Sequence, residues 1–78
     1  MITQLDRNRL AGEREALQDE ASEELRLANI STARIGAVMA YIQEQHDECL
    51  AVLKDFPDAD VQEVILAFRT LVRNLIKS

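Results

Sequence analysis

The sequence has few of the residues that stabilise small folds without a helical core. Its 78 residues include no tryptophan, one cysteine, one proline, two glycines, one tyrosine and two phenylalanines. The lone Cys49 cannot form an intramolecular disulfide, and so low a cysteine content is typical of a reducing compartment. We therefore expect a cytoplasmic protein. Because 78 residues bury only a small core, we also expect association with another chain to stabilise it.

Long hydrophobic runs are also missing. The longest apolar-rich stretch, residues 61–76, contains two arginines and a glutamate, and falls short of the roughly 20 apolar residues that a membrane span needs. Charged residues among the first ten positions argue against a signal peptide. The alternating Val, Ile and Thr patterns of strands are absent as well. These absences predict a soluble, all-α protein that does not bind membranes.

The excess of negative charge bears on possible partners. A net charge of −5 argues against a nucleic-acid-binding protein, which normally offers a basic surface to the phosphates. Only residues 60–78 carry more basic than acidic groups, three against two. Arg69, Arg73 and Lys77 form a basic ridge there at four-residue steps. This ridge either grips an acidic partner helix or complements the negative end of its own helix dipole.

The strongest positive signal is an apolar seam at helical spacing. Alternating steps of four and three residues connect Ala28, Thr32, Ile35, Met39, Ile42, His46, Cys49 and Leu53. At about 100° per residue, Leu10, Leu17 and Ala21 fall on the same face. The face therefore extends over more than half of the chain.

This phase match favours a long helix over about residues 3–54. A turn at residues 55–58 follows, because Pro57 cannot continue a helix, and a second helix over about 59–77 completes an antiparallel hairpin in a single helical domain, residues 1–78. The alternative is a compact three-helix bundle with a break near Asn29–Thr32, where Ser31 would be a new N-cap. We favour the continuous helix, which would be roughly 78 Å long.

In that hairpin the last helix covers only the Ile35–Leu53 half of the seam, so the earlier half needs another chain. We expect a homodimer or a helical partner protein, associating as a coiled coil or helical bundle. The residues that we predict at the interface are Leu10, Leu17, Ala21, Leu25, Ala28, Ile35, Met39, Ile42, His46, Leu66 and Phe68.

Motifs that carry chemistry are weak. His46 and Cys49 lie three residues apart on one helix face, and a symmetric dimer would bring together two of each, a set that can bind zinc. A core or interface role explains the pair more simply, and we expect no metal or other cofactor. The Glu-x-x-His motif of di-iron bundles is absent, since Gln43 precedes His46 by three positions. With no glycine-rich phosphate loop or nucleophile triad either, we expect neither an enzyme nor a small-molecule substrate.

Two functions remain. The first is a small acidic protein–protein interaction module: an adaptor, a regulator or a chaperone-like subunit. In size, acidity and helical layout the chain is similar to the short co-chaperones of bacterial export systems and to small phage or plasmid regulators, although no motif is shared. The alternative is an acidic inhibitor, in which Glu13, Glu20, Glu23 and Glu24 imitate a nucleic-acid backbone and occupy a DNA- or RNA-binding protein.

Overall fold

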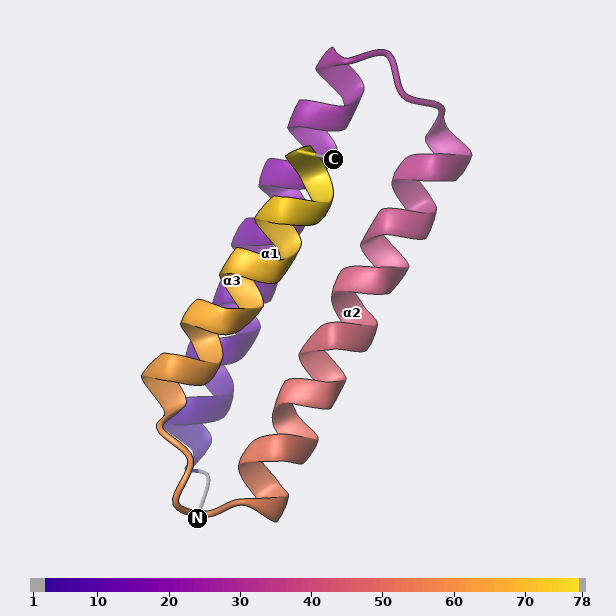
Figure 1. Cartoon of the computed structure of the whole chain (residues 1–78). Helices are drawn as coiled ribbons and strands as arrows, with labels where there is room; N and C mark the ends of the chain where they lie inside the picture. The colour runs from indigo at the N-terminus through magenta and orange to yellow at the C-terminus, as the bar shows by residue number, and fades with distance from the viewer. Residues whose placement is uncertain (1–2, 78) are drawn as a thin grey trace.

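Three α-helices make up the part of the chain that the computed structural model describes, residues 3–77 (Figure 1). They are α1 (Gln4–Leu27), α2 (Thr32–Asp55) and α3 (Val61–Lys77). The helices α1 and α2 run antiparallel, and α3 returns beside α1 in the same direction as α1 (Figure 1). No strand occurs within residues 3–77, so the all-α class is confirmed. The bundle measures 42 × 18 × 16 Å.

The predicted continuous helix over residues 3–54 is wrong, and the three-helix alternative is correct. The helix ends because Asn29 adopts a left-handed conformation, with φ of 60°. The Asn29 N–H then donates to the Arg26 carbonyl, and the Ile30 N–H donates to the Leu25 carbonyl, both at 3.0 Å. This Schellman pair satisfies carbonyls that the next helical turn would otherwise have bonded. Asparagine tolerates the left-handed region better than most residues.

Side-chain caps begin all three helices. The hydroxyl of Ser31, the N-cap of α2, accepts from the Arg34 N–H at 3.3 Å. At the start of α1, Thr3 and Asp6 form a reciprocal capping box with two bonds of 3.1 Å. Before α3, the Asp60 carboxylate accepts from the Gln62 N–H at 2.9 Å. Each cap satisfies N–H groups that have no partner inside the helix.

The core is built by all three helices. Its buried apolar side chains are Leu10, Leu17, Ala21, Ile42, Leu53, Ile65, Phe68 and Val72. In the predicted hairpin, the first half of the long helix would have had no partner within the chain. In the structure, α1 instead packs against α2 and α3. The break at Asn29 lets α1 fold back, so that Leu10 and Leu17 are covered within the same chain.

Candidate interaction surface

The three helices differ in length, and this leaves one end of the bundle open. Both α1 and α2 have 24 residues, whereas α3 has 17. A shortfall of two turns corresponds to about 10 Å of helix. Figure 1 shows the end of α3 well short of the connection between α1 and α2. The apolar face between these two helices therefore continues beyond the helix that covers it elsewhere.

An apolar groove lies at this end, with a volume of about 390 Å³. We call it the open-end groove. It is lined by Leu25, Ala28, Ile30, Arg34, Val38, Leu75 and Ile76, so that all three helices and the connection contribute. Arg34 is the single charged residue of this lining.

The break between α1 and α2 shapes the groove. Ile30 follows the left-handed Asn29, and its N–H bond to the Leu25 carbonyl holds these two apolar residues close together. The Ser31 cap fixes the first turn of α2, which carries Arg34. Among residues 3–77, no hydrogen bond or ion pair involves the exposed Arg34 guanidinium. The groove thus joins an apolar lining to an unpaired cation.

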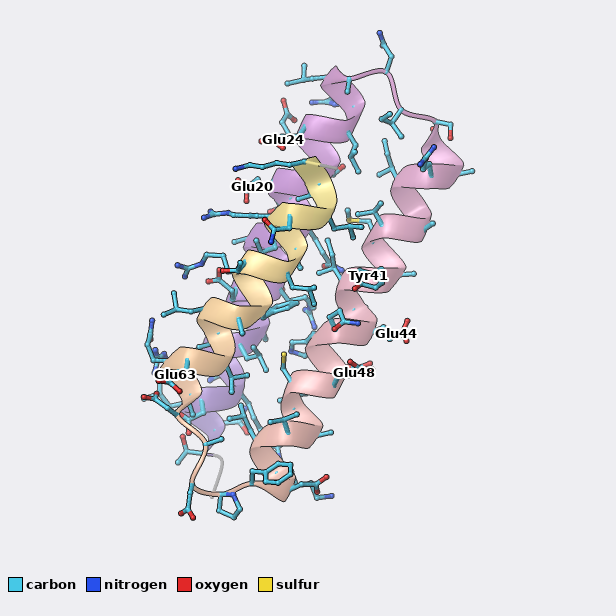
Figure 2. The ribbon with its side chains drawn as sticks, in the orientation of Figure 1. Glu20, Glu24, Tyr41, Glu44, Glu48 and Glu63 are labelled. Atoms are coloured by element: carbon cyan, nitrogen blue, oxygen red, sulfur yellow. The ribbon has the colours of Figure 1, made fainter. Side chains whose placement is uncertain are left out.

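A second, smaller hollow lies against the same end of α3. It has a volume of about 260 Å³ and is lined by Glu20, Glu24, Arg73, Ile76 and Lys77. We call it the charged hollow, because two acidic and two basic side chains line it. It shares Ile76 with the open-end groove. Glu20 and Glu24, labelled in Figure 2, lie on the last turns of α1 beside the end of α3. In the described part of the chain the exposed Glu24 carboxylate makes no ion pair.

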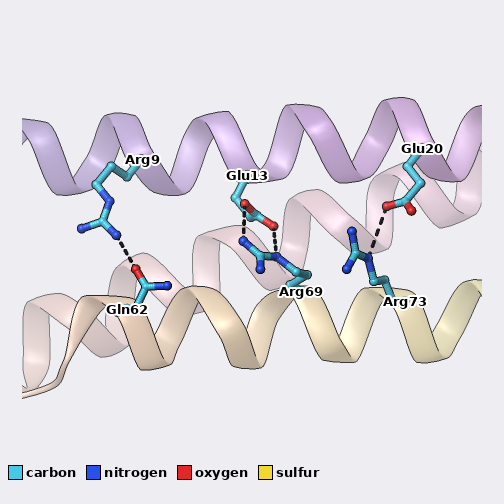
Figure 3. A network of polar contacts seen from close by, with 6 residues as sticks. All are labelled: Arg9, Glu13, Glu20, Gln62, Arg69 and Arg73. Carbon is cyan, nitrogen blue, oxygen red and sulfur yellow. Dashed lines mark hydrogen bonds and ion pairs between the residues drawn. The ribbon is translucent and has the colours of Figure 1, made fainter.

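Two of the three residues of the basic ridge, Arg69 and Arg73, contact acidic side chains of α1 (Figure 3). Arg69 donates to both carboxylate oxygens of Glu13, from Nε to Oε1 at 2.6 Å and from Nη2 to Oε2 at 3.2 Å. Arg73 Nε lies 3.5 Å from Glu20 Oε2. The hydrogen bond from Arg69, helped by the charges of Arg69 and Arg73, lowers the pKa of Glu13 although partial burial opposes this. Glu23 also pairs with Arg26 in α1, so three of the four glutamates expected to imitate a nucleic acid are paired within the chain.

The residues predicted at an interface are divided between the core and the surface. Six of them are buried in the single chain: Leu10, Leu17, Ala21, Ile42, His46 and Phe68. Leu25, Ile35 and Met39 are half-buried, and Ala28 and Leu66 are exposed. Of the eleven, only Leu25 and Ala28 line the open-end groove. For all eleven residues, a role in an interface stays a prediction.

Sequence reasoning missed the rest of the groove, namely Ile30, Arg34, Val38, Leu75 and Ile76. A signal was present in the segment lengths. Once the chain is divided at Asn29, two longer helices and one shorter helix follow within residues 3–77, and the shorter one covers only part of the face between the other two in this region. The prediction of one continuous helix over residues 3–54 gave only two helices, so it did not predict an uncovered end.

His46 and Cys49 are placed in the bundle rather than in a cluster of ligands. His46 is buried, with Nδ1 3.4 Å from Asp47 Oδ1 and its ring centroid 6.5 Å from that of Phe68. Burial, together with the charge of Glu48, raises the pKa of the Cys49 thiol, which disfavours the thiolate that binds metals. Within residues 3–77 no three His, Cys, Asp or Glu side chains are grouped closely enough to hold a metal ion.

None of the helices in the described region combines the length and the apolar character that crossing a membrane requires. Comparison with protein-family models, with curated proteins and with solved structures found no match to this chain. A functional assignment therefore depends on the geometry of the chain itself.

Proposed function

We propose that this chain is a small, acidic, cytoplasmic protein–protein interaction module, which binds a helical segment of another chain through the open-end groove. The observation that carries the proposal is the groove itself: six apolar residues from the three helices and the α1–α2 connection line a hollow beside the end of α3. An inserted apolar side chain would be taken out of water on several sides, which is favourable at about 25 cal/mol per Å² of apolar surface.

The exposure of apolar side chains supports this proposal. Leu27, at the end of α1, is 73% exposed, and Ala28 is exposed although it lies on the face that carries the core residues Leu17 and Ala21. Isolated exposed leucines are normal on protein surfaces. Their position next to a concave apolar groove distinguishes this end of the bundle, because apolar hollows with a polar rim are typical of binding sites.

Site-specific photo-crosslinking in cells tests the proposal. A photo-reactive amino acid replaces Ile30 in the groove, and the matched control carries it at Glu44, which is exposed on α2 and not in the groove. We expect a covalent adduct from position 30 and none from position 44. Mass spectrometry of the adduct shows whether the second component is another copy of this chain or a different protein.

A third position separates this surface from an alternative one. Leu66, predicted at an interface, is 44% exposed on α3 and lies outside the groove. Adducts formed from position 66 but not from position 30 would show that the chain binds its partners through α3 instead. Absence of adducts at both positions would contradict an interaction module.

A further inference from the structure

The apolar faces of α1 and α2 stay in phase across the bend that separates the two helices. Leu17 in α1 and Ile42 in α2 are both buried in the core. At about 100° per residue, these two side chains would differ in direction by only about 20° along an uninterrupted helix. A straight helix through the bend would therefore keep the buried residues of α1 and α2 on one continuous face.

The bend itself is compatible with a helix. Residues 28–31, which read Ala-Asn-Ile-Ser, include neither proline nor glycine. The left-handed position after a helix is usually glycine, because a Cβ atom is disfavoured in that conformation. Asn29, with φ of 60°, adopts it at a free-energy cost that glycine avoids and that a helical conformation would remove. The connection thus has a second conformation available to it.

We propose that the connection between α1 and α2 is a hinge, and that the chain has a second state in which residues 4–55 form one helix. In this state α1 leaves its own bundle and packs against α2 and α3 of a second copy, which gives its own α1 in return. Exchange of an identical element between two copies is domain swapping, a low-cost route to a dimer. The inference stands apart from the open-end groove, because it uses the contacts of the core.

The contacts of α1 single out a second copy as its partner. In the bundle, α1 buries Leu10, Leu17 and Ala21 in the core that it shares with α2 and α3. Glu13 of α1 also accepts two hydrogen bonds from Arg69 of α3. In the swapped dimer each of these contacts forms twice between the copies, and only the connection changes. The surface that α1 vacates is already complementary to α1 itself.

The shorter last helix leaves room for this arrangement. The two straight helices would run antiparallel about a twofold axis near residues 28–31, and each half of the dimer would repeat one three-helix bundle. Because α3 ends well short of the connection (Figure 1), the two copies of α3 would lie at opposite ends and would not meet at the axis. The long helix of each copy would measure roughly 78 Å.

The two states differ in the connection and in the number of chains. The monomer keeps the bonds of the bend and the Ser31 cap, whereas the dimer replaces them with helical hydrogen bonds. Association also restricts the free motion of two chains, which opposes the dimer at low concentration. We therefore expect a monomer in dilute solution and a swapped dimer whose population rises with protein concentration.

Substitution of Asn29 tests the hinge. Sedimentation equilibrium over a series of concentrations gives the dimerisation constants of the wild type, Asn29→Ala and Asn29→Gly. Alanine favours the helix and is disfavoured in the left-handed conformation, and each dimer contains two hinges. We expect Asn29→Ala to raise the dimerisation constant about 10-fold or more. Asn29→Gly, the matched control, should leave the constant unchanged or lower it.

Charge exchange between chains tests whether α1 is swapped. The variants Glu13→Arg and Arg69→Glu each place like charges together in their own bundle. In a swapped dimer of one variant with the other, α1 of each copy meets α3 of the other copy, so both opposite-charge pairs return. The variants are refolded together, and native mass spectrometry separates the three dimers by mass. We expect the mixed dimer to be at least about 10-fold more abundant than either variant's own dimer.

The matched control mixes Glu15→Arg with Arg69→Glu. Glu15 lies beside Arg14 in the same helix and has no contact with Arg69. Mixing these two variants restores no pair, so the mixed dimer should form only in the proportion that random exchange gives.

Three results would overturn the inference. The first is a wild type and an Asn29→Ala variant that are both monomeric at every concentration. The second is stronger dimerisation of Asn29→Gly than of Asn29→Ala. The third is a dimer without preference for the mixed pair at positions 13 and 69, which would show that closed bundles associate through their surfaces. The proposed function is judged separately: an adduct between position 30 and a different protein would support the interaction module even if the hinge never opens.

Discussion

At the scale of single residues, His46 is a polar group held inside an apolar core. It is 5% exposed and its Nε2 atom has no hydrogen-bond partner among residues 3–77. A buried polar atom without a partner costs about 1–3 kcal/mol. The sequence places this histidine on the seam correctly, but the seam alone does not reveal that its ring nitrogen is left unpaired.

We therefore expect His46→Leu to raise the free energy of unfolding by about 1 kcal/mol, because the substitution removes the unpaired nitrogen and keeps an apolar side chain in the core. Urea denaturation followed by circular dichroism measures this change. His46→Gln is the control, since it keeps a polar group and should not stabilise the fold. A loss of stability in His46→Leu would indicate that Nε2 is bonded in solution.

Ile42 has 0% of its surface exposed and contacts the core from the middle of α2. We expect Ile42→Asp to cost at least about 3 kcal/mol, since it buries a charge without a partner. The whole chain should have roughly 4–12 kcal/mol of stability, so the variant should lose a large part of it and melt at a much lower temperature. Thermal melting measures this effect. Ala40→Asp, on the exposed side of the same helix, should remain folded.

The Glu13–Arg69 contact makes part of the stability depend on pH. The pKa of Glu13 is lowered from 4.5 in the folded chain, mainly by the hydrogen bond from Arg69. Its contribution is therefore fully present above pH 4.5, and is lost as the pH falls through the lower folded value. We expect Glu13→Gln to lower the melting temperature by a few degrees at pH 7, and the difference from the wild type to shrink below pH 4.5.

A melting-temperature difference that stays constant between pH 7 and pH 3 would show that Glu13 contributes through packing rather than through its charge. The control is Glu15→Gln. The exposed Glu15 has its Oε1 atom 3.7 Å from Arg14 Nη2, and an exposed ion pair of this kind contributes little to the free energy of unfolding.

At the scale of elements, the connection between α1 and α2 decides the architecture. Asn29 is the non-glycine residue with positive φ in the described chain, and its left-handed conformation ends α1. Alanine is the best helix former but is disfavoured by about 1 kcal/mol or more in this conformation, whereas glycine adopts it freely. Substitution of Asn29 by alanine and by glycine therefore shows whether position 29 is left-handed or helical in solution.

We expect Asn29→Ala to lower the free energy of unfolding by about 1 kcal/mol and Asn29→Gly to leave it unchanged or raise it by about 0.5 kcal/mol. Chemical denaturation of both variants measures these values. The opposite order, with alanine stabilising and glycine destabilising, would show that a helix passes through position 29. That result would restore the long helix that the seam predicts.

Local signals in the sequence predicted most of the helix ends. The long helix was expected to begin near residue 3, where Thr3 and Asp6 form a capping box. The helix α2 ends at Asp55, before Pro57, and Ser31 caps α2 as in the three-helix alternative. The choice between the alternatives could not be made from these signals. A seam that stays in phase from Leu10 to Leu53 suits a continuous helix, and it equally suits two helices that turn the same face to a shared core.

At the scale of the whole molecule, the two architectures differ in length. The bundle is 42 Å long, with a Cα radius of gyration of 13.2 Å, whereas a continuous helix over residues 3–54 would extend roughly 78 Å. We expect small-angle X-ray scattering from dilute protein to give a maximum dimension close to that of the bundle. A maximum dimension near 80 Å at the lowest protein concentrations would contradict the bundle.

The candidate site could be predicted only in part. Leu25 and Ala28 were assigned to an interface from the phase of the seam, and both line the groove. Arg34 belongs to no apolar pattern, and Leu75 and Ile76 look like ordinary core positions of an amphipathic helix. They form a site because α3 stops beside them, which is a property of how three helices of unequal length are assembled.

The sequence by itself determined the all-helical class, the apolar faces, the caps and the turn at Pro57, because these depend on residues within a few positions of one another. The tertiary structure decided what covers each face. It buried Leu10 and Leu17 within the chain and paired the arginines of α3 with Glu13 and Glu20. It also left a groove between the end of α1, the start of α2 and the end of α3. The physical reason is that the burial of an apolar face depends on which helix packs against it. The left-handed Asn29 ends α1 and lets it fold back against α2, so that the faces of the two helices share one core.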